Sequence, residues 1–299
     1  MIRELKPEWL KVRAPSGERY ALVKQTLRDT DLHTVCEEAR CPNVGECWDS
    51  GTATFMLLGD VCTRGCRFCA VTKGNPRTVV DLREPDNTAI AAERMGLDYV
   101  VLTMVDRDDL VDGGAGHVAR TIRAIRGRCP GIRVEALVSD FRGVAADVRT
   151  VLDAEPDVFG HNVETVRRLV PEVRDARSSY DQSLAVLAIA RSIPGEHLTK
   201  SSIMLGLGET LEEVLETMRD LRDVGVEVLT LGQYLRPSEK HHAVARWVTP
   251  AEFDELRVAG ERMGFGIVAS GPLVRSSYRA AEHFVRRRLA VVRAGLQES

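Results

Sequence analysis

Three cysteines lie close together at Cys62, Cys66 and Cys69, separated by three residues and then by two. Three thiolates at this spacing can hold three corners of a four-iron, four-sulfur cube. The same run contains no fourth ligand, so one iron of such a cube would stay open for a substrate. Structural zinc sites usually pair cysteines two residues apart or add histidines, and the nearest upstream histidine is His33. The spacing therefore favours a reactive iron–sulfur cluster over a zinc knuckle.

A second group of three cysteines precedes the first, at Cys36, Cys41 and Cys47, with four and then five residues between them. We call this group the upstream trio and the later group the loop trio. The upstream trio again offers three thiolates, so a second cube would also lack one ligand. In a reducing cytoplasm, clustered cysteines are typical of metal ligands or catalysts rather than of disulfides. The seventh cysteine, Cys129, ends an amphipathic helix, and we expect it to be structural.

Length, net charge and the distribution of apolar residues exclude several classes of protein. The 299 residues suit one large domain or two small ones, and the net charge of -3 implies no general attraction to nucleic acid. No apolar run approaches the roughly 18 residues that a membrane helix needs. The first ten residues carry charge without the apolar core of a secretory signal. We therefore expect a cytoplasmic protein with neither a nucleic-acid nor a membrane partner.

Short apolar runs alternate with amphipathic stretches along most of the chain. The runs predict strands near residues 54–58, 98–103, 132–138, 157–161, 199–205, 227–231 and 265–269. The amphipathic stretches predict helices near residues 84–95, 115–128, 144–153, 164–170, 183–191, 211–221 and 250–263. Repeated strand–helix units imply a parallel sheet, either doubly wound or rolled into a barrel. Residues 1–52 lack this periodicity and favour an extended arm.

Polar and glycine-rich segments follow nearly every predicted strand. In a barrel, these segments share the C-terminal face, where active sites form, and the loop trio belongs on that face because it follows the first strand. A loop with this cysteine spacing, after the first strand of an alternating chain, resembles the radical S-adenosylmethionine family. The resemblance implies that the open iron binds the amino and carboxylate groups of S-adenosylmethionine. One electron from the cluster then cleaves the sulfonium and gives a 5′-deoxyadenosyl radical.

The same resemblance implies several residues that contact S-adenosylmethionine. Phe68 stands at the aromatic position of the motif, beside the adenine, and Thr103 belongs to the same predicted pocket. Asp106 is expected near the amino group, although a turn with solvated charge explains it equally well. Asn162 and Glu164 resemble residues near the ribose, and the other interpretation is a strand-to-helix cap.

The upstream trio narrows the resemblance to the lipoyl synthase family. That family carries both cysteine spacings, a Pro-Asn-x-x-Glu run between the second and third upstream cysteines, and a late Arg-Ser-Ser-Tyr motif, here residues 275–278. The resemblance implies that Ser277 gives an oxygen ligand to an auxiliary cluster on the upstream trio. It covers roughly residues 15–280, with small departures at Met104 and Arg279. Further matches lie at residues 105–114, 161–166, 200–209 and 232–235.

The resemblance implies a sulfurtransferase, a lipoyl synthase that inserts sulfur at C6 and C8 of an octanoyl chain on a carrier-protein lysine. Such C–H bonds are too weakly acidic for a side-chain base, so a radical cofactor is required. Two hydrogen abstractions need two S-adenosylmethionine molecules, and the auxiliary 4Fe-4S cluster is the sulfur donor. The implied carriers are the lipoyl domains of 2-oxoacid dehydrogenase E2 subunits and the glycine cleavage H protein. Ferredoxin or flavodoxin supplies electrons, and an iron–sulfur carrier supplies clusters.

Pattern and resemblance together predict an α/β fold, an incomplete (βα)6 TIM-type barrel over residues 53–270. Residues 1–52 form an N-terminal arm with the upstream trio, and residues 271–299 form a C-terminal segment with the serine ligand and a helix. A biotin synthase-like enzyme is one alternative, but the upstream trio and residues 275–278 argue against it. A non-catalytic iron–sulfur carrier is another, but it needs neither S-adenosylmethionine nor such a scaffold.

Other polar residues allow two interpretations each. Lys200 either meets an anion or lies exposed on the surface, and His161 is either a hydrogen-bonded core histidine or a pocket wall. His241 and His242 have no partner spacing that predicts a metal. The arginine-bearing helix predicted around residues 285–296 is either a solvated face or a docking surface for an acidic carrier protein.

Overall fold

The computed structural model describes residues 6–11, 18–38, 41, 43–49 and 52–277. The predicted terminal helix and Tyr278 lie outside these residues. Within the described part of the chain, one sheet has the strand order β1-β2-β5-β6-β7-β8-β9-β10. Its parallel strands are β2 (Thr52–Leu57), β5 (Tyr99–Met104), β6 (Arg133–Leu137), β7 (Val158–Gly160), β8 (Leu198–Leu205), β9 (Val228–Gln233) and β10 (Ile267–Gly271).

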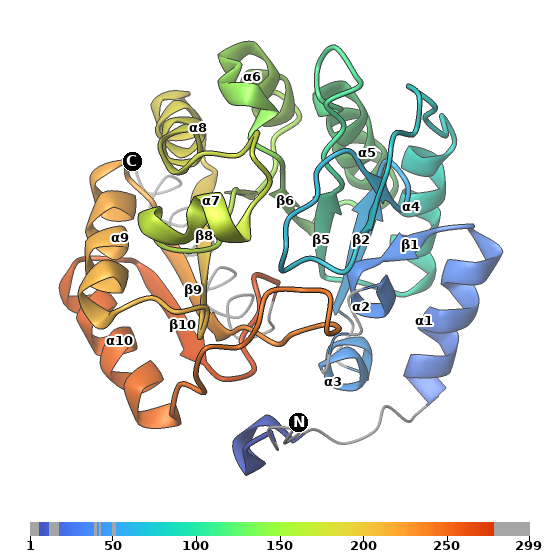
Figure 1. The fold of residues 1–299 in the computed structure, drawn as a ribbon. Coiled ribbons are helices and arrows are strands. Elements are labelled where there is room, and N and C mark those ends of the chain that lie inside the picture. Colours follow the sequence, from blue (N-terminus) through green and yellow to red (C-terminus); the bar gives the residue numbers. More distant parts are fainter. Residues whose placement is uncertain (1–5, 12–17, 39–40, 42, 50–51, 278–299) are drawn as a thin grey trace, which may run out of the picture.

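The sheet curves without closing on itself. The short strand β1 (His33–Thr34) runs antiparallel to β2 at one edge, and β10 forms the other edge. A separate pair, β3 (Val61–Cys62) and β4 (Thr72–Lys73), lies in the loop after β2. Figure 1 shows the long helices around the outside of the curved sheet. The predicted incomplete barrel is therefore confirmed, and the boundaries proposed at residues 52 and 270 remain predictions.

Most helices follow the strands in the predicted alternation. The outer helices are α4 (Glu84–Arg94), α5 (Ala115–Arg128), α6 (Ala145–Leu152), α8 (Tyr180–Ser192), α9 (Leu211–Asp223) and α10 (Pro250–Arg262). Shorter helical segments are η1 (Glu8–Leu10), η2 (Phe141–Gly143), η3 (Arg167–Leu169) and α7 (Val170–Val173). The strands are buried on both faces because helices cover one face and the barrel interior encloses the other.

Two sequence predictions are wrong in detail. The arm before residue 52 is not wholly extended, because it contains α1 (Glu18–Asp29), α2 (Val35–Glu38) and α3 (Val44–Asp49). Helix α1 buries Val23 and Leu27, and its Tyr20 ring lies 4.9 Å from the ring of Trp48 in α3. The few apolar positions of α1 follow a stretch with prolines at Pro7 and Pro15, which obscured their helical spacing.

The predicted helix at residues 164–170 begins too early. The Glu164 backbone has a φ of 69° and pairs with Ile203 of β8, so this residue extends the sheet instead of starting a helix. The Glu164 N–H donates to the Ser202 carbonyl over 3.1 Å, and the Met204 N–H donates to the Glu164 carbonyl over 2.8 Å. Tertiary pairing with β8 thus overrides the local preference for a helix.

The barrel interior holds a buried ion pair. Lys200 Nζ on β8 lies 2.8 Å from each carboxylate oxygen of Glu135 on β6, and the Tyr99 hydroxyl on β5 donates to Glu135 Oε2 over 2.7 Å. The Lys200 and Glu135 side chains are 2% and 1% exposed. The exposed-surface interpretation of Lys200 is therefore wrong, and the anion that it meets is a carboxylate of the protein itself.

Loss of one partner of this pair should be costly. In Lys200→Met the Glu135 carboxylate stays buried without its counter-charge, and we expect the free energy of unfolding to fall by about 3–5 kcal/mol. Urea denaturation of the metal-free protein measures this change. The double variant Lys200→Met/Glu135→Gln should recover much of the loss. Arg257→Met, which removes exposed ion pairs to Asp254 and Glu261 on α10, should cost much less, because water already screens these charges. Equal losses in the two single variants would contradict the prediction.

Candidate active site at the open end of the barrel

The loop trio lies directly after β2, at the C-terminal end of the parallel strands. Leu58 and Gly59 turn the chain out of β2 with φ angles of 69° and 85°. Their N–H groups donate to the Glu84 carboxylate over 2.8 and 3.3 Å, and His117 Nε2 lies 2.6 Å from the same carboxylate. The start of the loop is therefore anchored by a buried side chain from α4.

The three thiols of the loop trio are free and half-buried. Burial, with the negative charge of Asp106, raises the pKa of Cys62 to about 11, and burial with the neighbouring thiolates raises the pKa of Cys69 to about 12. The backbone N–H of Asp175 donates to Cys66 Sγ over 3.4 Å. Bound iron would favour the thiolate forms that burial disfavours, and N–H donors to sulfur are typical of cluster sites. The residues present thus fit a cube held at three corners.

The end of the loop is held from the opposite side of the barrel. After β9 the chain runs over the loop trio, where His241 Nε2 lies 3.0 Å from the Cys69 carbonyl oxygen. The His242 N–H donates to the Arg67 carbonyl over 2.8 Å, and His242 Nε2 contacts Glu172 at 3.1 Å. These histidines therefore bind protein groups in this structure, and their place over the cysteine loop has no signal in the sequence.

The upstream trio lies in and between the short helices α2 and α3. Cys36 and Cys47 are buried, and Cys41 is half-buried. Burial raises the pKa of Cys36 to about 12, and the nearby Cys41 thiol adds to this shift. The Cys41 N–H donates to the Cys36 carbonyl over 3.0 Å, so two of the thiols share one tight turn. Three clustered thiols are donors of the kind that iron–sulfur clusters bind.

The chain brings its C-terminal segment to this upstream trio. Asn43 Nδ2 donates to the Leu273 carbonyl over 2.7 Å, a contact between residues 230 positions apart. Burial lowers the pKa of the Arg275 guanidinium, while the adjacent Cys41 thiol opposes that shift. Ser277, which is half-buried, follows two residues later. Sequence distance hid this proximity, and only the motif at residues 275–278 pointed to it.

The predicted S-adenosylmethionine contacts lie around the loop trio. Thr103 and Asp106 are partly buried at the end of β5, and Cys62 Sγ lies 3.9 Å from Asp106 Oδ2. Burial raises the pKa of Asp106 to about 6. Asp106 lies 3.4 Å from Arg64, so its charge is paired and the solvated-turn interpretation is wrong for it. Phe68 packs against the apolar cluster between β8, β9 and their helices.

Asn162 and Glu164 lie together after β7. Asn162 Nδ2 donates to Glu164 Oε1 over 3.1 Å, and burial raises the pKa of Glu164. The first helical residue follows only at Arg167, so a strand-to-helix cap does not explain Glu164. Among the described residues, Asn162 Oδ1 is a buried acceptor without a hydrogen-bond partner, which leaves it available to a ligand.

Sequence reasoning missed Arg174, a buried arginine after α7. Its Nη1 donates to Ser183 Oγ over 2.7 Å, whereas Nε has no partner within the described part of the chain. Its positive charge acts on Cys66 and Glu164. His161 shares the Ser183 hydroxyl at 3.0 Å and contacts the Val138 carbonyl at 2.9 Å, so it is a hydrogen-bonded core histidine. Burial lowers the pKa of His161 to about 4.

An open parallel barrel with a three-cysteine loop after its first strand defines a radical S-adenosylmethionine enzyme. The family model for the Radical SAM superfamily matches residues 56–221. The crystal structure of methylornithine synthase superposes with a TM-score of 0.54 at 13% identity, over 93% of this chain and 89% of that one. The FeFe-hydrogenase maturase HydG from Carboxydothermus hydrogenoformans gives 0.55 at 13% identity, over 90% and 83%. These likenesses establish the fold.

The chain belongs to the lipoyl synthase family. Its residues 2–41 match the N-terminal domain of lipoyl synthase. It is 60% identical to lipoyl synthase of Sorangium cellulosum, over 94% of this chain and 79% of that protein. It is 58% identical to lipoyl synthase of Thermus thermophilus, over 94% and 87%. The chain is thus a sulfur-inserting radical enzyme whose family implies a 4Fe-4S cluster and S-adenosylmethionine. No helix in the described ranges has the length and apolar character to cross a membrane.

Proposed function

We propose that this enzyme inserts sulfur at C6 and C8 of octanoyl groups carried on protein lysines, with one cluster on each cysteine trio. The contact of Asn43 with Leu273 carries this proposal, because it brings the segment of Ser277 beside the upstream trio. Cys62, Cys66 and Cys69 then hold the cluster that binds S-adenosylmethionine. The upstream trio and Ser277 hold the auxiliary cluster.

The cluster of the loop trio, when bound, supplies the electron that cleaves S-adenosylmethionine. The side chains around the loop hold that molecule in place. Asp106 offers a carboxylate to its ammonium group, and Arg174 offers a buried positive charge to its carboxylate. Asn162 Oδ1 and the Glu164 carboxylate accept hydrogen bonds from the ribose hydroxyls, and Phe68 lies against the adenine. Thr103 lies near the end of β5, three residues before Asp106, and is the remaining proposed contact of S-adenosylmethionine.

An auxiliary cluster, which the upstream trio and Ser277 would hold, would supply the sulfur. An oxygen ligand such as Ser277 is harder than a thiolate and binds cluster iron more weakly, so it is the ligand suited to release. The carriers are octanoylated lipoyl domains of E2 subunits and the octanoylated H protein. A ferredoxin or flavodoxin reduces the loop cluster, and an iron–sulfur carrier rebuilds the auxiliary one. We propose a cytoplasmic location for the enzyme.

The test is a reaction of the anaerobically reconstituted protein with an octanoyl-lysyl peptide, S-adenosylmethionine and dithionite. We expect mass spectrometry to show a peptide with two added sulfur atoms. We also expect about two 5′-deoxyadenosine molecules per product, because each C–H bond needs its own radical. A protein that cleaves S-adenosylmethionine without adding sulfur to the peptide would refute the proposed substrate. Omission of the peptide is the control for uncoupled cleavage.

A further inference from the structure

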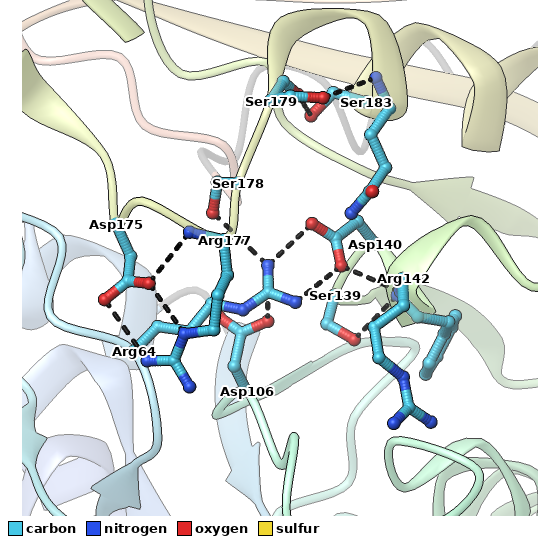
Figure 2. A network of polar contacts seen from close by, with 12 residues as sticks. Arg64, Asp106, Ser139, Asp140, Arg142, Asp175, Arg177, Ser178, Ser179 and Ser183 are labelled. Atoms are coloured by element: carbon cyan, nitrogen blue, oxygen red, sulfur yellow. Dashed lines mark hydrogen bonds and ion pairs between the residues drawn. The ribbon is translucent and has the colours of Figure 1, made fainter. Parts of the chain in front are cut away.

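Arg64 lies inside the cysteine loop, two residues after Cys62 and two before Cys66, and its side chain is 2% exposed. Figure 2 shows its guanidinium between Asp106, Asp140 and Ser178. Nη1 and Nη2 donate to the two Asp140 oxygens over 2.6 and 2.7 Å. Nε and Nη2 donate to the two oxygens of Asp108 over 3.0 and 2.9 Å. One arginine thus makes two bidentate pairs, to the segments that follow β5 and β6.

A second layer of contacts ties the same loop to the segment before α8. The Asp175 carboxylate accepts the Gly65 N–H over 2.8 Å, while the Asp175 N–H donates to Cys66 Sγ. Arg177 bridges Asp175 at 2.8 Å and Asp108 at 3.1 Å. Arg64 Nη1 also donates to Ser178 Oγ over 3.2 Å. The loop between the first two thiols is therefore held from three neighbouring segments.

Without Arg64, three carboxylates would lose the guanidinium that they share, and among the described residues only Asp108 would keep an ion pair, the one with Arg177. Three carboxylates, those of Asp106, Asp108 and Asp140, surround this single buried guanidinium within 3.4 Å. One of them, Asp106, also lies 3.9 Å from Cys62 Sγ. A cluster on this trio gains an electron when it is reduced, and nearby negative charge opposes that gain. The positive charge of Arg64 offsets part of this opposition.

We propose that Arg64 is a positioning residue for the loop-trio cluster, with two separable effects. Its planar guanidinium makes bidentate hydrogen bonds that tie the thiol loop to the segments after β5 and β6. A lysine ammonium cannot make such bidentate bonds. The charge of Arg64 favours one-electron reduction of the cluster by the low-potential donor. This inference rests on the proposed ligand role of Cys62, Cys66 and Cys69. It assigns a function to a residue outside the proposed set of cluster ligands.

The experiment is a redox titration of the full-length reconstituted protein, followed by electron paramagnetic resonance. The signal to follow is the one that changes when S-adenosylmethionine is added, because it reports the loop-trio cluster. At the wild-type midpoint, Arg64→Met should lower the ratio of reduced to oxidised cluster by about tenfold, a shift of about 59 mV for one electron. Asp140→Asn removes a negative charge and should raise the same ratio. Arg257→Met, on the outer face of α10, should leave it unchanged.

Arg64→Lys separates geometry from charge. It should keep the reduced-to-oxidised ratio within about twofold of wild type, since the charge remains. It should lose iron to a chelator several times faster than wild type, because one ammonium cannot replace two bidentate pairs. Equal chelation rates for Arg64→Lys and wild type would refute the geometric role.

Two outcomes distinguish this inference from the ligand assignment. If wild-type protein shows no signal that responds to S-adenosylmethionine, the ligand assignment fails and the role of Arg64 falls with it. If the signal is present but neither Arg64→Met nor Asp140→Asn moves its midpoint, only the charge effect is overturned. Should Arg64→Met fail to hold iron, Asp140→Asn decides alone, since an unchanged or lowered ratio in that variant also overturns the effect.

Discussion

Replacement of Cys66 by alanine is expected to abolish cleavage of S-adenosylmethionine. Because no radical then forms, sulfur insertion should stop as well. Cys66 is the middle thiol of the loop trio, and the Asp175 N–H donates to its sulfur. With one thiolate gone, the cube has only two protein ligands at this loop and is not retained. We expect 5′-deoxyadenosine formation to fall at least about a thousandfold, equivalent to about 4 kcal/mol of transition-state stabilisation.

Iron analysis distinguishes this loss from general misfolding. The Cys66→Ala protein should bind about four iron atoms where the wild type binds about eight, since the upstream trio is unaffected. Cys129→Ala is the matched control, because Cys129 caps the end of α5 and belongs to neither trio. That variant should keep both the iron and the 5′-deoxyadenosine rate of wild type. Undiminished cleavage by Cys66→Ala would remove the loop trio from the active site.

Ser277→Cys is expected to retain radical formation but to lose sulfur transfer. A thiolate is a softer ligand for iron than a serine oxygen and binds it more firmly. If release of Ser277 opens the auxiliary cluster, the fourth thiolate should hold that cluster closed. We expect 5′-deoxyadenosine to form near the wild-type rate, while sulfur addition to the octanoyl peptide falls at least about tenfold, or about 1.4 kcal/mol.

The neighbouring serine supplies the control for this second prediction. Ser276→Cys places the same thiol one residue earlier in the same segment, and it should transfer sulfur normally. Both products are measured in one assay, by chromatography for the nucleoside and mass spectrometry for the peptide. Normal sulfur transfer by Ser277→Cys would show that lability of the serine ligand is not required, although ligation itself could persist.

The fold was largely predictable because its signals are local. Each buried parallel strand is a short apolar run, and each outer helix has a single apolar stripe, so both periods are visible in sequence. The predicted helix at residues 115–128 matches α5 in both bounds. The misplaced helix start at Glu164 and the missed helices of the N-terminal arm, among them α1, are exceptions. In the first, pairing with β8 decides the backbone conformation, and in the second, packing against α3 compensates for weak local periodicity.

By itself, the sequence was enough to predict the cysteine loop as a cluster site. Three ligands from one loop need only local chain geometry to converge, and that geometry depends on their spacing. The sequence also determined the alternation of strands and helices that places the loop trio at the mouth of a barrel. The tertiary structure decided which distant groups meet. Asn43 reaches Leu273, Arg64 gathers carboxylates from two strand ends, and Lys200 is neutralised by Glu135. Such pairs depend on sheet order and register, which bring together residues that no spacing in the chain relates.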